Sequence, residues 1–302
     1  MDKLLVLQGG KSSEREVSLR SAATVTQQLH ALGYDVVVAD PAEADFNLEQ
    51  VARDCNVVLP MIHGADGEDG VWQKQLEAMD KTFLGSGSAA CALTFDKSKY
   101  REFVTAQGVR MAAGETVDRA GFTSSGLHQK PYVLKPIDGG SSVDTVIVHQ
   151  LADEPDEAYF DELFARHPSM LLEELIEGDE ITVAVLDTQA LPIILIVPPG
   201  DETFDYENKY NGRTQEIVDP PQLAEETKQK AQELALRLHR MTGCRHLSRT
   251  DMIVNGDGNL YVLETNTLPG LTDQSLFPKA AAAVGYDMRA LVKCFVTLAK
   301  EV

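Results

Sequence analysis

Two acids and an amide stand close together in a predicted β-hairpin near the end of the chain. Asp251 lies in an alternating run at 246–254, and a second run at 259–264 leads to Glu264 and Asn266. An Asn-Gly-Asp-Gly turn joins the runs, so the three side chains come level, and residues two apart share a face. Their oxygen atoms are hard ligands that suit Mg²⁺ beside phosphate groups. Solvated acids on an edge hairpin are the alternative.

A lysine followed by a glycine-serine loop is the second feature. Lys135 ends a predicted strand, and Gly139, Gly140, Ser141 and Ser142 follow it. Glycines let backbone N–H groups approach phosphate oxygens, and the lysine supplies a positive charge. The Walker A pattern is absent from the sequence. The loop favours phosphate binding, with an ordinary glycine-serine turn as an equally weighted alternative.

Two further loops follow predicted strands in the first part of the chain. Glu14 stands at a predicted helix start, where its carboxylate could hold an ammonium group. Capping of that helix by Ser13 and Glu16 is compatible with this role. The GxGxxG pattern is not met, which disfavours a nicotinamide cofactor. His63 lies in a loop of glycines and acids at a strand's carboxyl end, where ligands bind in open α/β sheets.

The pattern of strands and helices that must position these residues predicts three domains, at 1–90, 91–178 and 179–302. In the first domain, apolar runs separated by a glycine turn and a helical pattern indicate a parallel α/β layout. The second domain is a smaller α+β unit. The third contains the hairpin and an irregular stretch at 198–221, whose length indicates either a functional or a disordered segment.

The expected elements follow from periodicity. Strands are predicted at 3–8, 36–39, 57–62, 131–135, 143–148, 169–175, 180–186 and 191–197. Helices are predicted at 89–107 with a break near Asp96, at 156–166, and around residues 17–29, 231–238 and 288–296.

Charge and composition exclude several classes of protein. The chain has 47 acidic and 27 basic residues and a formal net charge of −20, without the clustered Lys and Arg that nucleic-acid binding needs. Its apolar runs are too short for a membrane span or a signal peptide, so we expect a cytoplasmic protein without a membrane partner. The four cysteines lack zinc-site spacing and are expected as buried free thiols: Cys55, Cys91, Cys244 and Cys294.

Six ordered segments of the chain resemble motifs of the D-alanine–D-alanine ligase family, within the ATP-grasp superfamily. They are GGKSSEREVSL, HGADGEDG, LGSGSAACALTFDK, LKPIDGGSSV, ENKY and LETNTLPGLTDQSLFP. The resemblance covers nearly the whole chain. It implies an α/β (α+β overall) ATP-grasp fold preceded by a Rossmann-like N-terminal domain. It also implies ATP-dependent joining of two D-alanine molecules through a D-alanyl phosphate, for peptidoglycan precursors, with two Mg²⁺ or Mn²⁺ ions and a homodimer.

The resemblance also implies roles for single residues. ATP would be bound by Lys97, Lys135, Ser142, Glu173, Glu174, Ile176, Glu180 and Lys209. The metal ions would be held by Asp251, Glu264 and Asn266. The catalytic residues and those near the first D-alanine would be Glu14, His63, Ser141, Tyr210, Arg249 and Gly270. The second D-alanine would bind through Ser275 and Leu276.

Within this set, Glu14 would anchor the ammonium group of the first D-alanine, and His63 would lie near its carboxylate. Arg249 and the backbone of Gly270 would form an oxyanion site. Residues 200–216 resemble the family's closing loop, where Tyr210 would link to Ser141 and Glu14. Such a loop would exclude water from the acyl phosphate.

Two departures and three alternatives accompany the resemblance. Asp144 stands where the family usually has glycine, and its carboxylate is expected to repel ATP phosphates. Glu174 often has a lysine counterpart.

The alternatives are a ligase forming D-alanyl-D-lactate, another ATP-grasp carboxylate–amine ligase, and a non-catalytic nucleotide-binding relative. Under the first alternative, our hypothesis is that Tyr210→Phe shifts the product toward the ester, as a competition between D-alanine and D-lactate would reveal.

Overall fold

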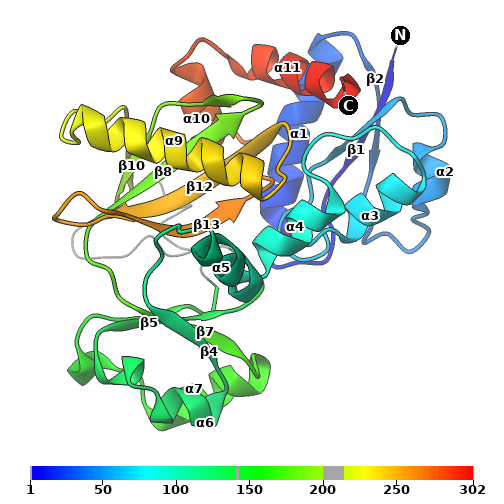
Figure 1. Ribbon diagram of the computed structural model, residues 1–302. Coiled ribbons are helices and arrows are strands. Elements are labelled where there is room, and N and C mark those ends of the chain that lie inside the picture. Colours follow the sequence, from blue (N-terminus) through cyan, green and yellow to red (C-terminus); the bar gives the residue numbers. More distant parts are fainter. Residues whose placement is uncertain (1, 141–142, 200–213, 302) are drawn as a thin grey trace.

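The computed structural model describes residues 2–140, 143–199 and 214–301 of the 302-residue chain. These residues form three β-sheets with helices packed against them (Figure 1). One sheet falls within each of the predicted ranges 1–90, 91–178 and 179–302, and we propose these ranges as the domains.

The first sheet has the strand order β2-β1-β3, and all its strands are parallel. Its strands are β1 (Lys3–Leu7), β2 (Asp35–Ala39) and β3 (Val57–Pro60). The predicted parallel layout is therefore confirmed. Two short helices also lie in this range, α2 (Leu48–Ala52) and α3 (Val71–Ala78).

Helix α1 (Arg15–Ala31) begins one residue after Glu14, which occupies the N-cap position. The capping box predicted for Ser13 and Glu16 is therefore wrong. Instead, the hydroxyl oxygen of Ser12 accepts a hydrogen bond from the backbone N–H of Glu14. The predicted apolar face is buried against the core, at Val17, Ala22, Val25 and Leu29.

The second sheet has four antiparallel strands in the order β4-β7-β5-β6. They are β4 (Gly114–Val117), β5 (Tyr132–Pro136), β6 (Val146–Val148) and β7 (Met170–Glu174). Their core is closed by α6 (Arg119–Ser124) and α7 (Glu157–Arg166). Two 3₁₀ turns complete the unit, η1 (Leu127–Gln129) and η2 (Leu151–Asp153). The strand β4 is too short and too exposed for its alternation to be detected in the sequence.

Two helices lead from the first sheet to the second. They are α4 (Ser88–Phe95) and α5 (Lys97–Ala106). The predicted break lies at Asp96, whose carboxylate accepts a hydrogen bond from the N–H of Lys99 at 2.9 Å and so caps α5.

The third sheet has the order β11-β10-β8-β12-β13, with β9 paired to β8. Its strands are β8 (Asp179–Leu186), β9 (Gln189–Ala190), β10 (Ile194–Val197), β11 (Gln215–Val218), β12 (Leu247–Val254) and β13 (Leu260–Asn266). Helix α9 (Glu225–Met241) covers one face of this sheet (Figure 1). Strand β11 lies inside the stretch predicted as irregular, so that part of the prediction is wrong.

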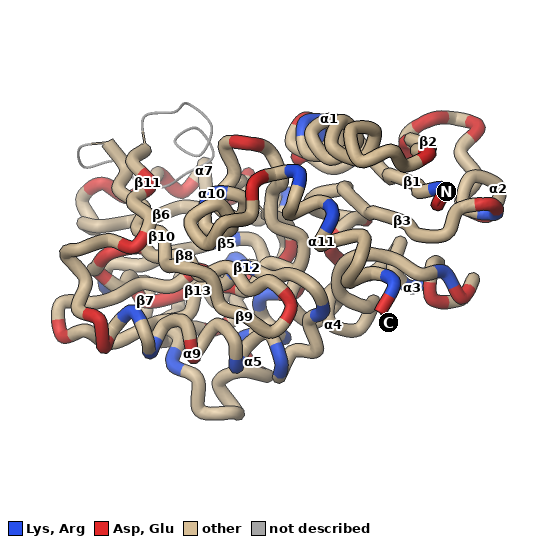
Figure 2. Tube along the Cα trace, turned by 90° about the horizontal axis from the view of Figure 1, so that it is seen from above, with Lys and Arg blue, Asp and Glu red and all other residues tan. Residues whose placement is uncertain are grey.

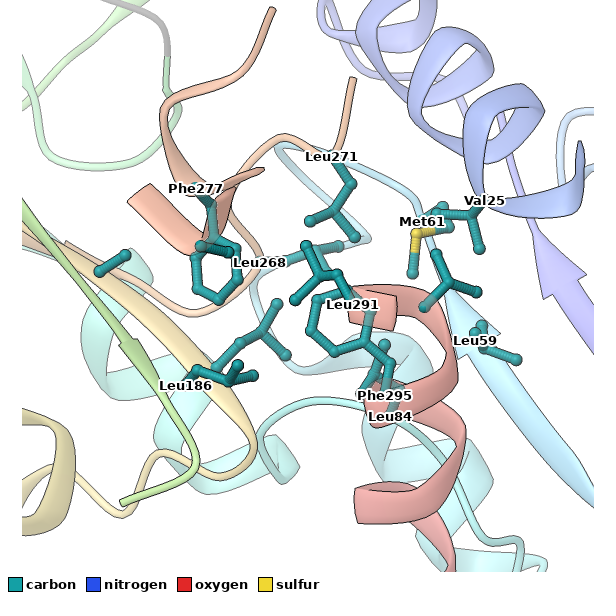
Figure 3. Packing of buried hydrophobic residues seen from close by; sticks show 14 of the residues in the cluster. Val25, Leu59, Met61, Leu84, Leu186, Leu268, Leu271, Phe277, Leu291 and Phe295 are labelled. Atoms are coloured by element: carbon teal, nitrogen blue, oxygen red, sulfur yellow. The ribbon is translucent and has the colours of Figure 1, made fainter. Parts of the chain in front are cut away.

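The last two helices are α10 (Leu276–Ala282) and α11 (Met288–Lys300). Leu291 and Phe295 of α11 pack with Val25 of α1 and Leu59 of β3, although α11 follows the third sheet in the sequence (Figure 3). This buried cluster also includes Leu186 of β8. One apolar core therefore joins the first and third sheets.

Three of the predicted buried thiols, Cys55, Cys91 and Cys244, are buried and free, whereas Cys294 is partly exposed. None of the helices in the described part of the chain is long and apolar enough to cross a membrane. Lys and Arg positions are scattered among those of Asp and Glu along the described trace (Figure 2).

Three buried histidines make the protein sensitive to acid. Burial lowers the pKa of His63, His239 and His246 to about 4. Between about pH 6.5 and 4 the unfolded chain binds protons at these imidazoles and the folded chain does not. Each histidine should therefore lower the free energy of unfolding by up to about 1.4 kcal/mol per pH unit as the pH falls through this window, whereas the raised pKa of buried Glu68 acts in the opposite direction.

Urea denaturation at pH 7 and pH 5 measures this loss. The variant His239→Gln should lose less stability than the unmodified protein over the same interval, and exposed His149→Gln is the control. An equal pH dependence in all three proteins would contradict the prediction.

Candidate active site

The hairpin formed by β12 and β13 brings the predicted residues level with one another. Asp251 lies opposite Glu264, and Arg249 lies opposite Asn266. Arg249 donates from Nε and Nη2 to the two carboxylate oxygens of Asp251, at 2.9 and 2.7 Å. Thr182 of β8 donates to the same carboxylate at 2.5 Å. Asp251 is therefore held from two strands.

The oxygen atoms of this hairpin fit a hard divalent cation. The side chain of Glu264 is 33% exposed, and Lys97 Nζ lies 3.7 Å from its carboxylate. The amide oxygen of Asn266 accepts one hydrogen bond, from the N–H of Leu268 at 2.9 Å, which leaves its second lone pair available. Within the described ranges no three or more His, Cys, Asp and Glu side chains group as a metal site, so a cation here would also need the amide and phosphate oxygens.

Two lysines stand beside the glycine loop. The ammonium group of Lys97 donates to the carbonyl oxygen of Gly139 at 2.7 Å. Lys135 pairs with Glu173 at 2.6 Å, and the same carboxylate pairs with Arg101 at 2.8 Å. Both lysine side chains are mostly buried, at 14% and 12% exposure, so their charges act in a weakly screened environment.

A cavity of about 670 Å³ lies between the glycine loop, helix α1 and the hairpin. Glu14, Lys97, Gly140, Arg249 and Glu264 all line it. The predicted amino-acid pocket and two of the three predicted metal ligands, Glu264 and Asn266, therefore open into one space.

The carboxylate of Glu14 lies between two glycines. A β-carbon on Gly64 would stand 2.7 Å from Oε2 of Glu14, and one on Gly140 would stand 2.8 Å from the same atom. Gly64 also has a φ of +75°, which favours glycine. The two loops are therefore shaped around this carboxylate.

His63 lines the cavity, but both of its ring nitrogens have structural partners. Nδ1 lies 3.1 Å from the carbonyl oxygen of Leu268, and Nε2 lies 3.1 Å from the hydroxyl of Ser21. A carbonyl oxygen can only accept, so Nδ1 carries the proton and the Ser21 hydroxyl donates to Nε2. This geometry suits a residue that joins α1 to the loop after β13.

Glu68 is a cavity residue to which the sequence assigned no role. It accepts a hydrogen bond from the N–H of Gly64 at 2.6 Å. Burial, and then the nearby carboxylate of Glu14, raises the pKa of Glu68 well above its ordinary value. Its position five residues after His63, in the same loop of glycines and acids, is the signal that could have identified it.

The far end of the cavity is formed by the loop before α10. Ser275 precedes α10, and its hydroxyl oxygen accepts from the N–H of Thr272 at 3.1 Å. Gly270 lies against this hydroxyl, because a β-carbon there would stand 2.8 Å from it. Lys279 and Glu216 form an ion pair at the same end, and neither was selected from the sequence.

Comparison with known proteins decides the family. A sequence model described as "D-ala D-ala ligase C-terminus" matches residues 107–297. A D-alanine–D-alanine ligase of Xanthobacter autotrophicus is 40% identical over 96% of both chains, and one of Halalkalibacterium halodurans is 36% identical over 98% of both. This chain belongs to the D-alanine–D-alanine ligase family.

A solved structure supports the fold of this ligase family member. The D-alanine–D-alanine ligase of Bacillus anthracis complexed with ATP superposes with a TM-score of 0.86 at 28% identity, over 100% of this chain and 98% of that one. The predicted fold, an α/β ATP-grasp fold with a Rossmann-like N-terminal domain, is confirmed.

The structure brings nine of the fifteen predicted site residues that it describes to one cavity of this ligase family member. The cavity is lined by Glu14, His63, Lys97, Arg249, Glu264, Asn266, Gly270, Ser275 and Leu276. A second hollow of about 360 Å³ is lined partly by Glu174 and Ile176. Lys135, Glu173 and Asp251 pair with the residues described above, and Glu180 lies in β8 opposite Ile253. Ser141, Ser142, Lys209 and Tyr210 lie outside the described residues.

Asp144 does not extend free toward the phosphate site. Arg166 Nη2 donates to one carboxylate oxygen at 2.9 Å, and His167 Nε2 lies 2.7 Å from the other. Burial acts to raise the pKa of Asp144, but these hydrogen bonds lower it below its ordinary value. Asp144 has a φ of +57°, which glycine adopts more readily. The guanidinium of Arg166 offsets the charge that was expected to repel ATP, and His167 adds a hydrogen-bond contact.

Proposed function

We propose that this chain joins two D-alanine molecules into D-alanyl-D-alanine, converting ATP to ADP and phosphate. One observation carries the proposal: Glu14, Lys97, Arg249 and Glu264 line a single cavity. An amino acid held at Glu14 would thus lie within the same space as the nucleotide's terminal phosphate. The relatives named above, which are D-alanine–D-alanine ligases, support the choice of substrate.

The first step activates the donor. A carboxylate does not react with an amine at neutral pH, because its oxygen is a poor leaving group. In our proposal the donor's carboxylate oxygen attacks the γ-phosphorus of ATP, which gives D-alanyl phosphate and releases ADP. Glu14 would hold the donor's ammonium group, and Lys97 and Lys135 would offset the charge of the phosphates.

The second step forms the peptide bond. The acceptor's free amine attacks the carbonyl carbon of D-alanyl phosphate, the C–O bond to phosphate then breaks, and the proton that the nitrogen loses leaves with the phosphate. Arg249 and the N–H of Gly270 would stabilise the oxyanion of the tetrahedral intermediate. Ser275 and the backbone of Leu276 would bind the acceptor's carboxylate. His63, with both nitrogens engaged, would position the loop after β13.

Asp251, Glu264 and Asn266 are the residues that would hold two Mg²⁺ ions, or Mn²⁺. Bound metal ions would neutralise part of the negative charge on the phosphate groups. The adenine would contact Glu173, Glu174 and Ile176, and the ribose would contact Glu180.

The other roles of the proposal fall on residues that the structure does not describe. They are phosphate and substrate contacts by Ser141, Ser142, Lys209 and Tyr210. A cytoplasmic location, a homodimer and a role in peptidoglycan precursor synthesis complete the proposal.

Phosphate release tests the proposed reaction. Purified protein with ATP and Mg²⁺ should release phosphate only when D-alanine is added, with D-alanyl-D-alanine formed in equal amount. L-alanine, other D-amino acids and D-lactate form the comparison series. Preference for another amino acid would indicate a different ATP-grasp ligase, and ATP binding without turnover would indicate a non-catalytic relative.

A methyl group at Gly140 should disturb donor binding. Gly140→Ala places a β-carbon 2.8 Å from the Glu14 carboxylate, so that carboxylate must shift. We expect KM for the donor D-alanine to rise about tenfold. Gly126→Ala is the control, because a β-carbon there has no described atom within 4 Å. Initial rates against D-alanine concentration measure the effect, and an unchanged KM in Gly140→Ala would refute this use of Glu14.

A further inference from the structure

Helix α5 presents one face to the segments that carry the proposed ATP and metal residues. Lys97, Tyr100 and Arg101 occupy positions i, i+3 and i+4, which lie on the same side of a helix. Lys97 reaches the carbonyl of Gly139 in the glycine loop, and Arg101 reaches Glu173 at the end of β7. Tyr100, the third residue on this face, has no role in the proposed reaction.

Tyr100 reaches the third segment, strand β13. Its hydroxyl lies 2.6 Å from the hydroxyl of Thr265, and that hydroxyl lies 3.0 Å from the hydroxyl of Thr250. The three residues are 1%, 2% and 0% exposed. A chain of buried hydroxyl groups therefore fastens α5 to β13 and β12, and such groups are costly to leave without a partner.

The contact between Tyr100 and Thr265 lies at the part of β13 that carries the proposed metal ligands. Thr265 stands between Glu264 and Asn266, and alternation along a strand places its side chain on the opposite face from theirs. Tyr100 thus contacts β13 on the face opposite to the side chains of Glu264 and Asn266. Lys97, one turn earlier in α5, lies near Glu264 from the cavity side.

We propose that Tyr100 is a positioning residue for the metal–nucleotide site, which sets Glu264 and Asn266 at a fixed distance from Lys97. The inference rests on the proposed use of ATP and Mg²⁺, but not on the identity of the amino acid. A hydroxyl bond of this kind fixes a strand to a helix without touching any substrate, so its loss should act on metal-dependent binding.

The variant Tyr100→Phe removes only the hydroxyl oxygen. Binding of ADP is measured by calorimetry with Mg²⁺ and again with EDTA. We expect Kd for ADP with Mg²⁺ to rise about three- to tenfold, and Kd with EDTA to change less than twofold. Thr265→Val should give the same pattern, and the double variant should bind ADP no more weakly than the weaker single variant, because either change alone already breaks the Tyr100–Thr265 interaction.

Tyr132→Phe is the matched control. Tyr132 is also fully buried, and its hydroxyl donates to Glu154 at 2.5 Å in the core of the second sheet. It should lower the thermal midpoint as Tyr100→Phe does and leave both Kd values unchanged. If Tyr100→Phe fails to fold, Thr265→Val alone carries the test.

Three results would overturn the proposal. They are equal weakening of ADP binding with and without Mg²⁺, additive effects of the two single changes, and equal weakening in the Tyr132→Phe control. Failure of the proposed ligase reaction is a separate result: it would appear as absent D-alanine-dependent phosphate release while ADP binding still distinguishes the variants.

Discussion

Replacing Arg249 by methionine should lower kcat for dipeptide formation by about 10²- to 10³-fold, the effect of removing one donor from an oxyanion site. The guanidinium is fixed by two hydrogen bonds to Asp251 and lines the cavity. Burial acts to lower the pKa of Arg249, but the neighbouring carboxylates of Asp251 and Glu264 raise it above its ordinary value. It therefore stays cationic throughout the reaction.

Stability and catalysis must be separated in this variant. Asp251 is only 8% exposed, so losing its cationic partner also destabilises the fold. Arg119→Met is the control, because Arg119 pairs with Glu157 and Asp161 far from the cavity. Arg249→Lys keeps the charge but not the two-pronged geometry, and should recover only part of kcat. Phosphate release at saturating substrates measures kcat, and a folded Arg249→Met protein with kcat within threefold would disprove the role.

The hairpin could be predicted from sequence because its strands and its turn depend on residues that are close together in the chain. Alternation on both sides of a four-residue turn placed Asp251 and Glu264 near each other, but a register shift between Asp251 and Met252, which the sequence did not predict, brings them directly opposite. The parallel first sheet was predictable for the same reason, since its glycine turn and helical pattern follow each other directly. The predicted irregular stretch failed at β11, whose four residues pair with β10 but are too few to show a period.

Contacts between distant segments could not be predicted. Asp144 was expected to repel phosphates, but its partners Arg166 and His167 lie more than twenty residues away in the sequence. The contact of Tyr100 with Thr265 spans 165 residues and depends on how α5 docks against the third sheet. Local pattern therefore identified residues that line the cavity, whereas tertiary packing determined which charges are paired and which strands are held.

Glu14→Gln is the second change with a large expected effect. It keeps the size of the side chain and removes the charge that would pair with the donor's ammonium group. A hydrogen bond between charged groups contributes about 1.5–3 kcal/mol, so kcat/KM for the donor D-alanine should fall about ten- to 150-fold. The residue Glu14 is 8% exposed and its carboxylate is flanked by Gly64 and Gly140, so solvent screens its charge little.

The comparison that isolates this effect uses Glu16→Gln, an exposed position on the same helix. Both variants remove one negative charge near the start of α1, but only Glu14 lines the cavity. Steady-state rates against D-alanine concentration should separate a weak donor site from an unchanged acceptor site, and Kd for ATP should be the same in both variants. Equal kcat/KM in the two variants would mean that the ammonium group is bound elsewhere, and the shared cavity would then no longer support ligation at this site.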